Sequence, residues 1–286
     1  MDISALKAFI AVAETGSFSR AAEALFLTQP AISKRIRSLE NELNTKLYDR
    51  IGRTVALTQA GNTLLPRAKK ILLDLDDSIR SIHNLNESVT GKLRFATSHH
   101  IGLHRLPPAL RTFSQQYPEV QLGISFMDSE NACQLVETGA LELAIVTLPL
   151  TPLPGLKTQL IWEDPLSVTV LKSHPLARNK TLQLTDLADH RAILPSPNTF
   201  TRQIVDGAFE KLHLKLDVYL STNYLETIKM LVSIGIGWSV LPETMIDKNI
   251  VSLKVKEIGL KRSLGIVYHR ERSLSNAARQ FIAGLT

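Results

Sequence analysis

Hydroxyl, amide and imidazole side chains are concentrated in four short segments that could bind a small molecule. These segments are Thr97–His100, Thr147, Ser196–Thr199 and Thr222–Asn223. Each follows a stretch whose pattern predicts a β-strand, and ligands of α/β folds bind outside the carboxyl ends of strands. Several also precede a predicted helix, whose N-terminus favours anions. The pattern predicts a site for a small polar or anionic ligand. The alternative, that these residues only cap helices, is stronger for each residue alone than for the four segments together.

Three histidines, His99, His100 and His104, lie in or just after the first segment. His100 and His104 are four residues apart, the spacing of half a zinc motif, but the glutamate of the metalloprotease motif is missing and no carboxylate or cysteine lies at a suitable spacing. We therefore predict no metal and no cofactor, and leave open whether these histidines bind an ion. An imidazole ordinarily titrates at about 6.5, so a protonated His100 could also hold an anion.

An enzyme is the main alternative class of protein, and the motifs argue against it. Neither the Gly-x-Gly-x-x-Gly nor the Gly-x-Ser-x-Gly spacing occurs, so a glycine-rich phosphate loop and a nucleophile elbow are missing. Cys133, the single cysteine, lies on a predicted helix beside Leu135 and Val136, which favours a packed apolar side chain over a redox sensor. We predict no enzymatic activity.

A helix predicted from about Gln29 to Leu43 has a face suited to DNA. Its apolar stripe is formed by Ile32, Ile36, Leu39 and Leu43. The opposite face carries Pro30, Lys34, Arg37, Ser38 and Asn41, with Gln29 and Ser33 at its edge. Lysine and arginine bind phosphates or guanine edges, and glutamine and serine offer adaptable hydrogen bonds. This helix is therefore predicted to enter the major groove.

The segment Phe18 to Arg37 is predicted to form a helix-turn-helix that ends in the basic helix. Residues 48–57 indicate two short strands around a glycine turn, a wing with Arg50 and Arg53 near its tip. Such arginines lie along phosphates or enter the minor groove. One alternative is a purely structural three-helix module. Another is a binding module that has lost its DNA function, against which the intact basic face argues.

The charge distribution also favours DNA. The net charge is +6, and residues 1–70 hold eleven basic and six acidic side chains, so +5 of the excess lies in the first quarter of the chain. A small basic module is typical of a protein that binds an acidic polymer, although a solvated basic surface is the alternative. Apolar residues make up 44%, and no stretch approaches the roughly 20 apolar residues of a membrane helix. We expect a soluble, cytoplasmic protein of about two domains.

A long helix is predicted from Thr58 to about Leu85. Its apolar positions alternate spacings of four and three, as in a coiled coil, at Leu64, Ala68, Ile71, Leu75, Ser78, Ile82 and Leu85. We expect this seam to pair with a second copy of the chain, and packing against its own chain is the alternative. A polar hinge at residues 84–91 follows.

Strands and helices alternate after this hinge, which predicts an α/β domain with mainly parallel sheets. The predicted strands are residues 92–96, 121–126, 142–146, 167–171, 192–194, 218–220, 236–241 and 264–268. The predicted helices are residues 105–116, 130–138, 202–212, 224–234 and 275–285.

Seven segments along the chain form a recognisable set of motifs: Ala11–Phe18, Ala21–Ala22, Thr28–Ser33, Ile36–Glu40, Leu57–Gly61, His174–Ala177 and Gly235–Gly237. Through these motifs the chain resembles LysR-type transcriptional regulators over its whole length. Tyr48 departs from the family's usual phenylalanine. The resemblance implies an N-terminal all-α winged helix-turn-helix (1–58), a dimerising linker helix and hinge (59–90), and an α/β effector-binding domain (91–286). This domain is expected to be like a type 2 periplasmic binding protein, with subdomains of about 92–161 plus 267–286 and about 162–266, joined by two crossover strands.

The resemblance also implies a function and partners. The chain is expected to bind promoter DNA as a dimer of dimers, a homotetramer, and to activate or repress transcription, with RNA polymerase a possible partner. A small-molecule effector is expected to bind between the two subdomains. Its binding is expected to bend or relax the bound DNA rather than to switch DNA binding on or off. The expected DNA contacts are Gln29, Pro30, Ser33, Lys34, Arg37, Arg50 and Arg53. The expected effector contacts are Ser98, His99, His100, Ser129, Thr147, Ser196, Asn198 and Thr199.

Overall fold

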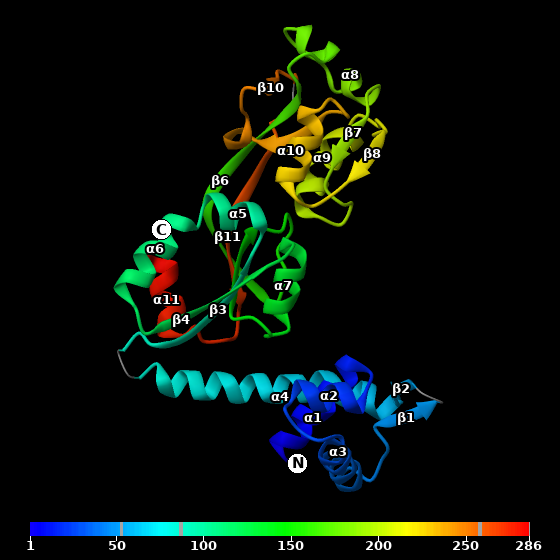
Figure 1. The fold of residues 1–286 in the computed structure, drawn as a ribbon, viewed down its shortest axis with the longest axis vertical. Coiled ribbons are helices and arrows are strands. Elements are labelled where there is room, and N and C mark those ends of the chain that lie inside the picture. Colours follow the sequence, from blue (N-terminus) through cyan, green and yellow to red (C-terminus); the bar gives the residue numbers. More distant parts are fainter. Residues whose placement is uncertain (52–53, 86–87, 257–258, 286) are drawn as a thin grey trace. The chain divides into compact units, whose positions relative to one another are not determined.

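The chain forms two compact units, Met1–Asn86 (unit 1) and Glu87–Thr286 (unit 2). The computed structural model describes residues 1–51, 54–85, 88–256 and 259–285, and Figure 1 labels its helices and strands. No helix within these residues is long and apolar enough to cross a membrane.

Unit 1 consists of three short helices, a hairpin and one long helix. The elements are α1 (Ile3–Thr15), α2 (Phe18–Ala24), α3 (Gln29–Glu42), β1 (Tyr48–Ile51), β2 (Thr54–Leu57) and α4 (Gln59–His83). β1 and β2 pair in antiparallel fashion. This order confirms the predicted winged helix-turn-helix and the long helix after it.

Hydroxyl caps begin three of these helices. Ser17, Thr28 and Thr58 each accept a hydrogen bond from the backbone N–H three residues further along the chain. Pro30 lies in the first turn of α3, where its missing N–H is harmless. The boundaries of α3 and α4 therefore fall within two residues of the predicted ones.

The core of unit 1 joins α1, α2, α3, the hairpin and the first half of α4. Phe9, Ile32, Ile36 and Leu39 are all buried in it. Leu43, which the apolar stripe also predicts to be buried, is instead 38% exposed because α3 ends just before it.

Gly61 allows α4 to start against the hairpin. A Cβ atom at this position would lie 2.3 Å from the carbonyl oxygen of Leu47 and 2.8 Å from Cδ2 of Leu57. Only glycine fits such a close approach. The Leu57–Gly61 motif thus combines a helix cap at Thr58 with a contact that excludes a side chain.

Unit 2 is built on a seven-stranded sheet of order β10–β6–β11–β5–β3–β4, with β9 also paired to β6. Its strands are β3 (Gly91–Thr97), β4 (Val120–Phe126), β5 (Leu143–Thr147), β6 (Leu156–Leu171), β9 (Ser239–Pro242), β10 (Ile250–Leu253) and β11 (Lys261–His269). A separate parallel pair joins β7 (Ala192–Leu194) and β8 (Val218–Ser221).

Two long strands connect the two halves of this sheet (Figure 1). β6 pairs with β11 from Leu156 to Pro165 and then continues beside β9 and β10. The prediction of mainly parallel sheets is wrong for this sheet. β3 is parallel to β4 and β5, whereas the pairs β5–β11, β11–β6, β6–β9 and β6–β10 are antiparallel. The reason is that β6 and β11 cross between the halves in opposite directions.

Helices cover the sheet strands of unit 2. They are α5 (His99–His104), α6 (Pro107–Gln116), α7 (Ser129–Glu137), α8 (Leu184–Ala188), α9 (Phe200–Glu210), α10 (Leu225–Ser233) and α11 (Asn276–Ala283), with 3-10 turns at Pro175–Arg178 and Glu243–Met245. One apolar core surrounds Phe95 and Phe281, and a second surrounds Trp238 and Phe209. The sheet therefore has a separate core at each end of its long strands.

Candidate nucleic-acid interface and ligand pocket

The basic face of α3 is exposed in unit 1. Gln29, Pro30, Lys34 and Arg37 are exposed, and Ser33 is half-buried, with its Oγ accepting a hydrogen bond of 3.2 Å from Gln29 Nε2. Within the described residues neither Lys34 nor Arg37 takes part in a hydrogen bond or ion pair. Both charges are therefore available to an external acidic group.

The end of α3 is fixed by a buried carboxylate. Glu40 accepts a hydrogen bond of 2.9 Å from the backbone N–H of Leu47 and one of 3.0 Å from Lys46 Nζ. This contact holds the connection between α3 and the hairpin. Since the apolar side of α3 is also buried, the orientation of its basic face is set by the core.

The hairpin is attached to the same core. The hydroxyl of Tyr48 donates a hydrogen bond to the backbone carbonyl of Phe9. This bond satisfies the polar atom that tyrosine adds at a position where the family usually has phenylalanine. Arg50 belongs to β1, while Arg53, the other expected wing contact, lies outside the described residues.

One pocket in unit 2 brings together six of the eight expected effector contacts, Ser98, His99, His100, Ser129, Thr147 and Thr199. The rest of its lining is Asp128, Glu130, Pro195, Thr201, Asn223, Leu225 and Arg262. Most of these residues come from the carboxyl ends of strands and the starts of helices, whereas Arg262 lies at the start of β11. The cavity volume is about 50 Å³, whereas one water occupies roughly 30 Å³ in the liquid. A ligand the size of an organic acid therefore requires the lining to move apart.

Two of the expected hydroxyl contacts already bond to the protein. Ser129 Oγ accepts a hydrogen bond of 3.1 Å from the backbone N–H of Thr147. Thr199 caps α9, because its Oγ1 accepts from the N–H of Arg202 at 3.2 Å. Ser98 precedes α5 without a side-chain cap bond. Helix capping thus explains the presence of a hydroxyl at Thr199, whereas the Ser98 hydroxyl has no partner among the described residues.

The other two expected effector contacts lie outside this lining. Asn198 is exposed and Ser196 is half-buried. The N–H of Ser196 donates to Asn223 Oδ1 at 2.9 Å, and Asn223 Nδ2 donates to Asp128 Oδ2 at 2.7 Å. Asn223 belongs to one of the four polar segments but was not among the expected contacts, and it forms part of the pocket wall.

A buried arginine is the main pocket residue that the sequence does not reveal. Arg262 is 5% exposed, and its Nε donates to Asp164 Oδ2 at 2.7 Å. The same carboxylate accepts a hydrogen bond of 2.9 Å from Arg105. Nη2 of Arg262 is buried and has no hydrogen-bond partner among the described residues. Burial lowers the pKa of Arg262 and the Asp164 carboxylate raises it, and an arginine remains charged in proteins.

His100 is neutral at physiological pH. Burial, followed by the positive charge of Arg262, lowers its pKa from 6.5 to about 4. This low pKa argues against a protonated His100 as the group that holds an anion. The pocket's buried positive charge is the guanidinium of Arg262.

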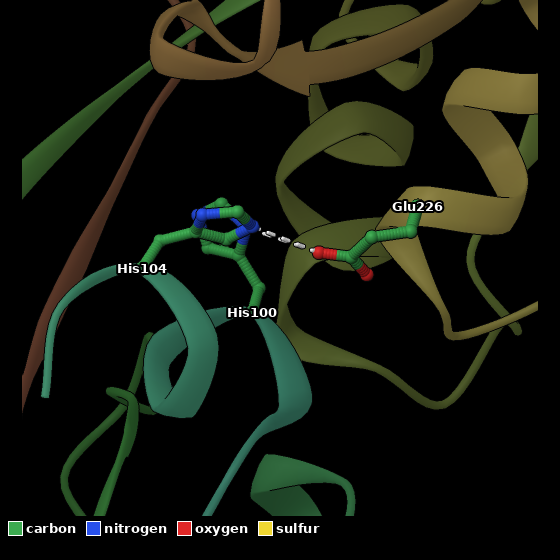
Figure 2. Close-up of side chains that lie close together, drawn as sticks. All are labelled: His100, His104 and Glu226. Carbon is green, nitrogen blue, oxygen red and sulfur yellow. Dashed lines mark hydrogen bonds and ion pairs between the residues drawn. The ribbon is translucent and has the colours of Figure 1, made fainter. Parts of the chain in front are cut away.

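A carboxylate distant in sequence meets two of the three histidines (Figure 2). Oε1 of Glu226, in α10, lies 3.1 Å from His104 Nε2 and 3.9 Å from His100 Nδ1. His99 lies apart from this group, with its ring 5.3 Å from that of Phe126 and 4.8 Å from that of Tyr224. Glu226 is 122 residues from His104, so no local spacing could reveal the contact.

Comparisons with known proteins agree with both units. Residues 3–62 match the family described as bacterial regulatory helix-turn-helix protein, lysR family, and residues 86–286 match the LysR substrate binding domain. An uncharacterized HTH-type transcriptional regulator from the ibpB–leuC intergenic region of Azotobacter vinelandii is 64% identical over 108 residues, which are 38% of this chain and 75% of that protein. The HTH-type transcriptional activator CmpR of Synechocystis is 31% identical over 279 residues, 96% of this chain and 91% of that one.

A solved structure shares the fold over the full length. The chain is similar to a full-length variant of OxyR from Pseudomonas aeruginosa, with 24% identity, a TM-score of 0.72 and coverage of 100% of this chain and 93% of that chain. The two family matches together span nearly the whole sequence. The chain therefore belongs to the LysR family of DNA-binding transcriptional regulators, with an N-terminal helix-turn-helix and a C-terminal effector-binding domain.

Proposed function

We propose that α3 reads a promoter sequence. Lys34 and Arg37 make its charged contacts, and Gln29, Pro30 and Ser33 make its uncharged contacts. The observation that carries this proposal is the exposed face of α3, on which neither cation pairs with another described residue. The wing residues Arg50 and Arg53 are proposed to contact the flanking backbone. In this arrangement the side chains on α3 supply the sequence preference and the wing supplies affinity.

Fluorescence anisotropy with operator DNA tests this assignment. Arg37→Ala is expected to weaken binding by about 1–3 kcal/mol and to relax the preference at one base pair, if Arg37 contacts a base edge. Lys7→Ala is the matched control because Lys7 is an exposed cation of unit 1 on α1. Equal affinity and equal sequence preference of the wild type and the Arg37 variant would contradict the placement of α3.

We propose that the pocket of unit 2 takes a small anionic effector. Arg262 supports this class of ligand because its buried Nη2 lacks a partner. The hydroxyl of Ser98 is a further free donor. The proposed subdomains, about 92–161 plus 267–286 and about 162–266, are supported by the two long strands β6 and β11, which link two separate apolar cores.

A thermal-shift screen of small carboxylates tests the effector proposal. A ligand at 100 times its Kd adds about 2.7 kcal/mol to the stability of the folded state. Ser98→Ala is expected to weaken binding of the hit by about 0.5–1.5 kcal/mol, and Asn198→Ala, outside the pocket lining, is the control. A hit with the same affinity for both variants and for the wild type would place the effector elsewhere.

We also propose that the second half of α4 pairs with another copy, towards a dimer of dimers. The apolar side chains of Ile71, Ile79, Ile82 and Leu85 are exposed in the single chain, which supports such a seam. As a regulator of transcription the protein is proposed to act in the cytoplasm, with RNA polymerase as its eventual target and without catalysing a reaction.

A further inference from the structure

His100 is a buried histidine whose polar atoms are unsatisfied. It is 3% exposed, and neither ring nitrogen has a hydrogen-bond partner in the part of the chain that the structure describes. Buried polar atoms are nearly always bonded, so an exception points to a missing water, ion or ligand. His100 is therefore a group that an additional species would satisfy.

Two further metal-ligating side chains lie next to it. His104 follows four residues later on α5, so both rings project from one side of the helix, with their centroids 4.8 Å apart. Glu226 faces them from α10 (Figure 2). Within the described residues this is the one group of three such side chains whose ligand atoms lie close together, all within 4.8 Å of one another.

We propose that His100, His104 and Glu226 form a binding site for a divalent transition-metal ion, with zinc as the best-suited ion. Two imidazoles and one carboxylate are a donor set that zinc accepts, and three protein ligands leave a fourth position for water or another ligand. Zinc has a stronger preference for imidazole nitrogen than magnesium or calcium, which favour all-oxygen sites.

The distances suit one shared ion. Bonds of about 2.0–2.1 Å in a tetrahedron place neighbouring ligand atoms about 3.4 Å apart. The observed separations from Glu226 Oε1 are 3.1 Å to His104 and 3.9 Å to His100. All three ligand atoms lie within 4.8 Å of one another, so an ion bound by all three would draw them closer together by side-chain rotation. His99, packed against Phe126 and Tyr224, is not part of the set.

The charged side chains around Glu226 pair with one another. Asp164 pairs with the two nearest guanidinium groups, those of Arg262 and Arg105. Lys229, also on α10, pairs with Asp247. Among the residues that the structure describes, no lysine or arginine pairs with Glu226, and its contacts are with His100 and His104.

An ion at this site would tie α5 to α10. His100 also lines the pocket, so the ion would place positive charge at the pocket edge. A metal-dependent increase in affinity for an anionic effector follows, and this second consequence rests on the function proposed above. The ion-binding step itself does not depend on DNA or effector.

Zinc titration of the full chain tests the site directly. After EDTA treatment and dialysis, isothermal titration calorimetry is expected to show one equivalent of Zn²⁺ bound per chain. His104→Ala and Glu226→Gln should each weaken this binding at least about tenfold, since losing even an outer-shell partner costs 10–100-fold. These two side chains are 46% and 41% exposed, so their replacement leaves the core intact, which circular dichroism can verify.

Two controls make the outcome decisive. His213→Ala removes an exposed histidine outside the cluster, and it should bind Zn²⁺ like the wild type. Co²⁺ in place of Zn²⁺ should give the intense visible absorption of a four-coordinate ion in the wild type and lose it in both cluster variants. The absence of a stoichiometric site in the wild type, or unchanged Zn²⁺ affinity in either cluster variant, would overturn the proposal.

Discussion

Cys133 lies in an apolar cluster formed by α7 and the strands beneath it, with 2% of its surface exposed. Burial, together with Glu130 and Glu137, raises the pKa of its thiol to about 12. The thiolate is the reactive form of cysteine. A thiol with this pKa is about one part in ten thousand ionised at pH 8, which gives Cys133 a packing role.

Cys133 is expected to resist thiol reagents in the folded protein. At pH 8 the wild type should react with Ellman's reagent only after a denaturant is added, and should then release one equivalent per chain, because Cys133 is the only cysteine. The measurement is the absorbance of the released thiolate over time. Full reaction of the folded protein within minutes would contradict the buried position.

Individual residues of the pocket differ in how far the sequence predicts them. Ser98, His99 and His100 directly follow one strand, so they are predicted by the rule that ligands bind outside the carboxyl ends of strands. Arg262 meets Asp164 across 98 residues, and each belongs to a strand whose local pattern does not mark a ligand site. Such pairs arise from the topology of the sheet, which periodicity does not encode.

At the scale of elements, helices with local start signals are predicted well and long strands are not. α3 and α4 begin at hydroxyl caps and carry regular apolar stripes. β6 extends from Leu156 to Leu171, but only its last third, Ser167–Leu171, has a recognisable apolar pattern. Glu163, Asp164 and Pro165 interrupt the first part, and its pairing with β11 comes from tertiary structure rather than local propensity.

The junction between the hairpin and α4 gives an element-level prediction. Gly61→Ala places a Cβ against the carbonyl of Leu47 and is expected to destabilise unit 1 by about 1–3 kcal/mol, as overpacking does. Both tryptophans, Trp162 and Trp238, lie in unit 2. Urea unfolding followed by far-ultraviolet circular dichroism should therefore show that unit 1 unfolds at a lower urea concentration. The transition followed by tryptophan fluorescence, which reports on unit 2, should occur at the same urea concentration as in the wild type.

Gly207→Ala is the matched control for this change. Gly207 lies within α9, and a Cβ there would meet no atom within 4 Å. Alanine in a helix interior is more favourable than glycine by about 0.5–1 kcal/mol, so the variant should be slightly more stable. Equal stability of Gly61→Ala and the wild type would show that the hairpin tolerates the extra methyl group.

At the scale of the whole molecule, α4 divides into two parts. Its first half packs into the core of unit 1, with Ala68 fully buried, whereas Ile82 is 64% exposed and Leu85, just after the helix, is 81% exposed. Packing within unit 1 therefore accounts for the start of the predicted seam, and the later part is the segment proposed to pair with a second copy. A coiled-coil partner is the natural cover for such a stripe.

Ile71→Asp is expected to reduce self-association. The substitution places a charge in the proposed apolar seam, and desolvating it costs at least roughly 2 kcal/mol. Sedimentation velocity should show smaller species than for the wild type. Asn62→Asp changes the charge by the same amount at an exposed position away from the seam, so it should leave the mass of the sedimenting species unchanged. Identical mass distributions for the wild type and both variants would place the seam elsewhere.

Selecting bound duplexes from a random-sequence pool with the full chain, and sequencing them, shows whether this chain reads specific duplex sequence as a dimer. We predict an enriched motif with two symmetry-related half-sites, spaced by about 10–10.5 base pairs or a multiple of that turn, because a twofold dimer presents two recognition helices. Arg37→Ala should lose enrichment at one position of each half-site. A pool with no enriched motif, or the same motif recovered equally by the Arg37 variant, would contradict the account.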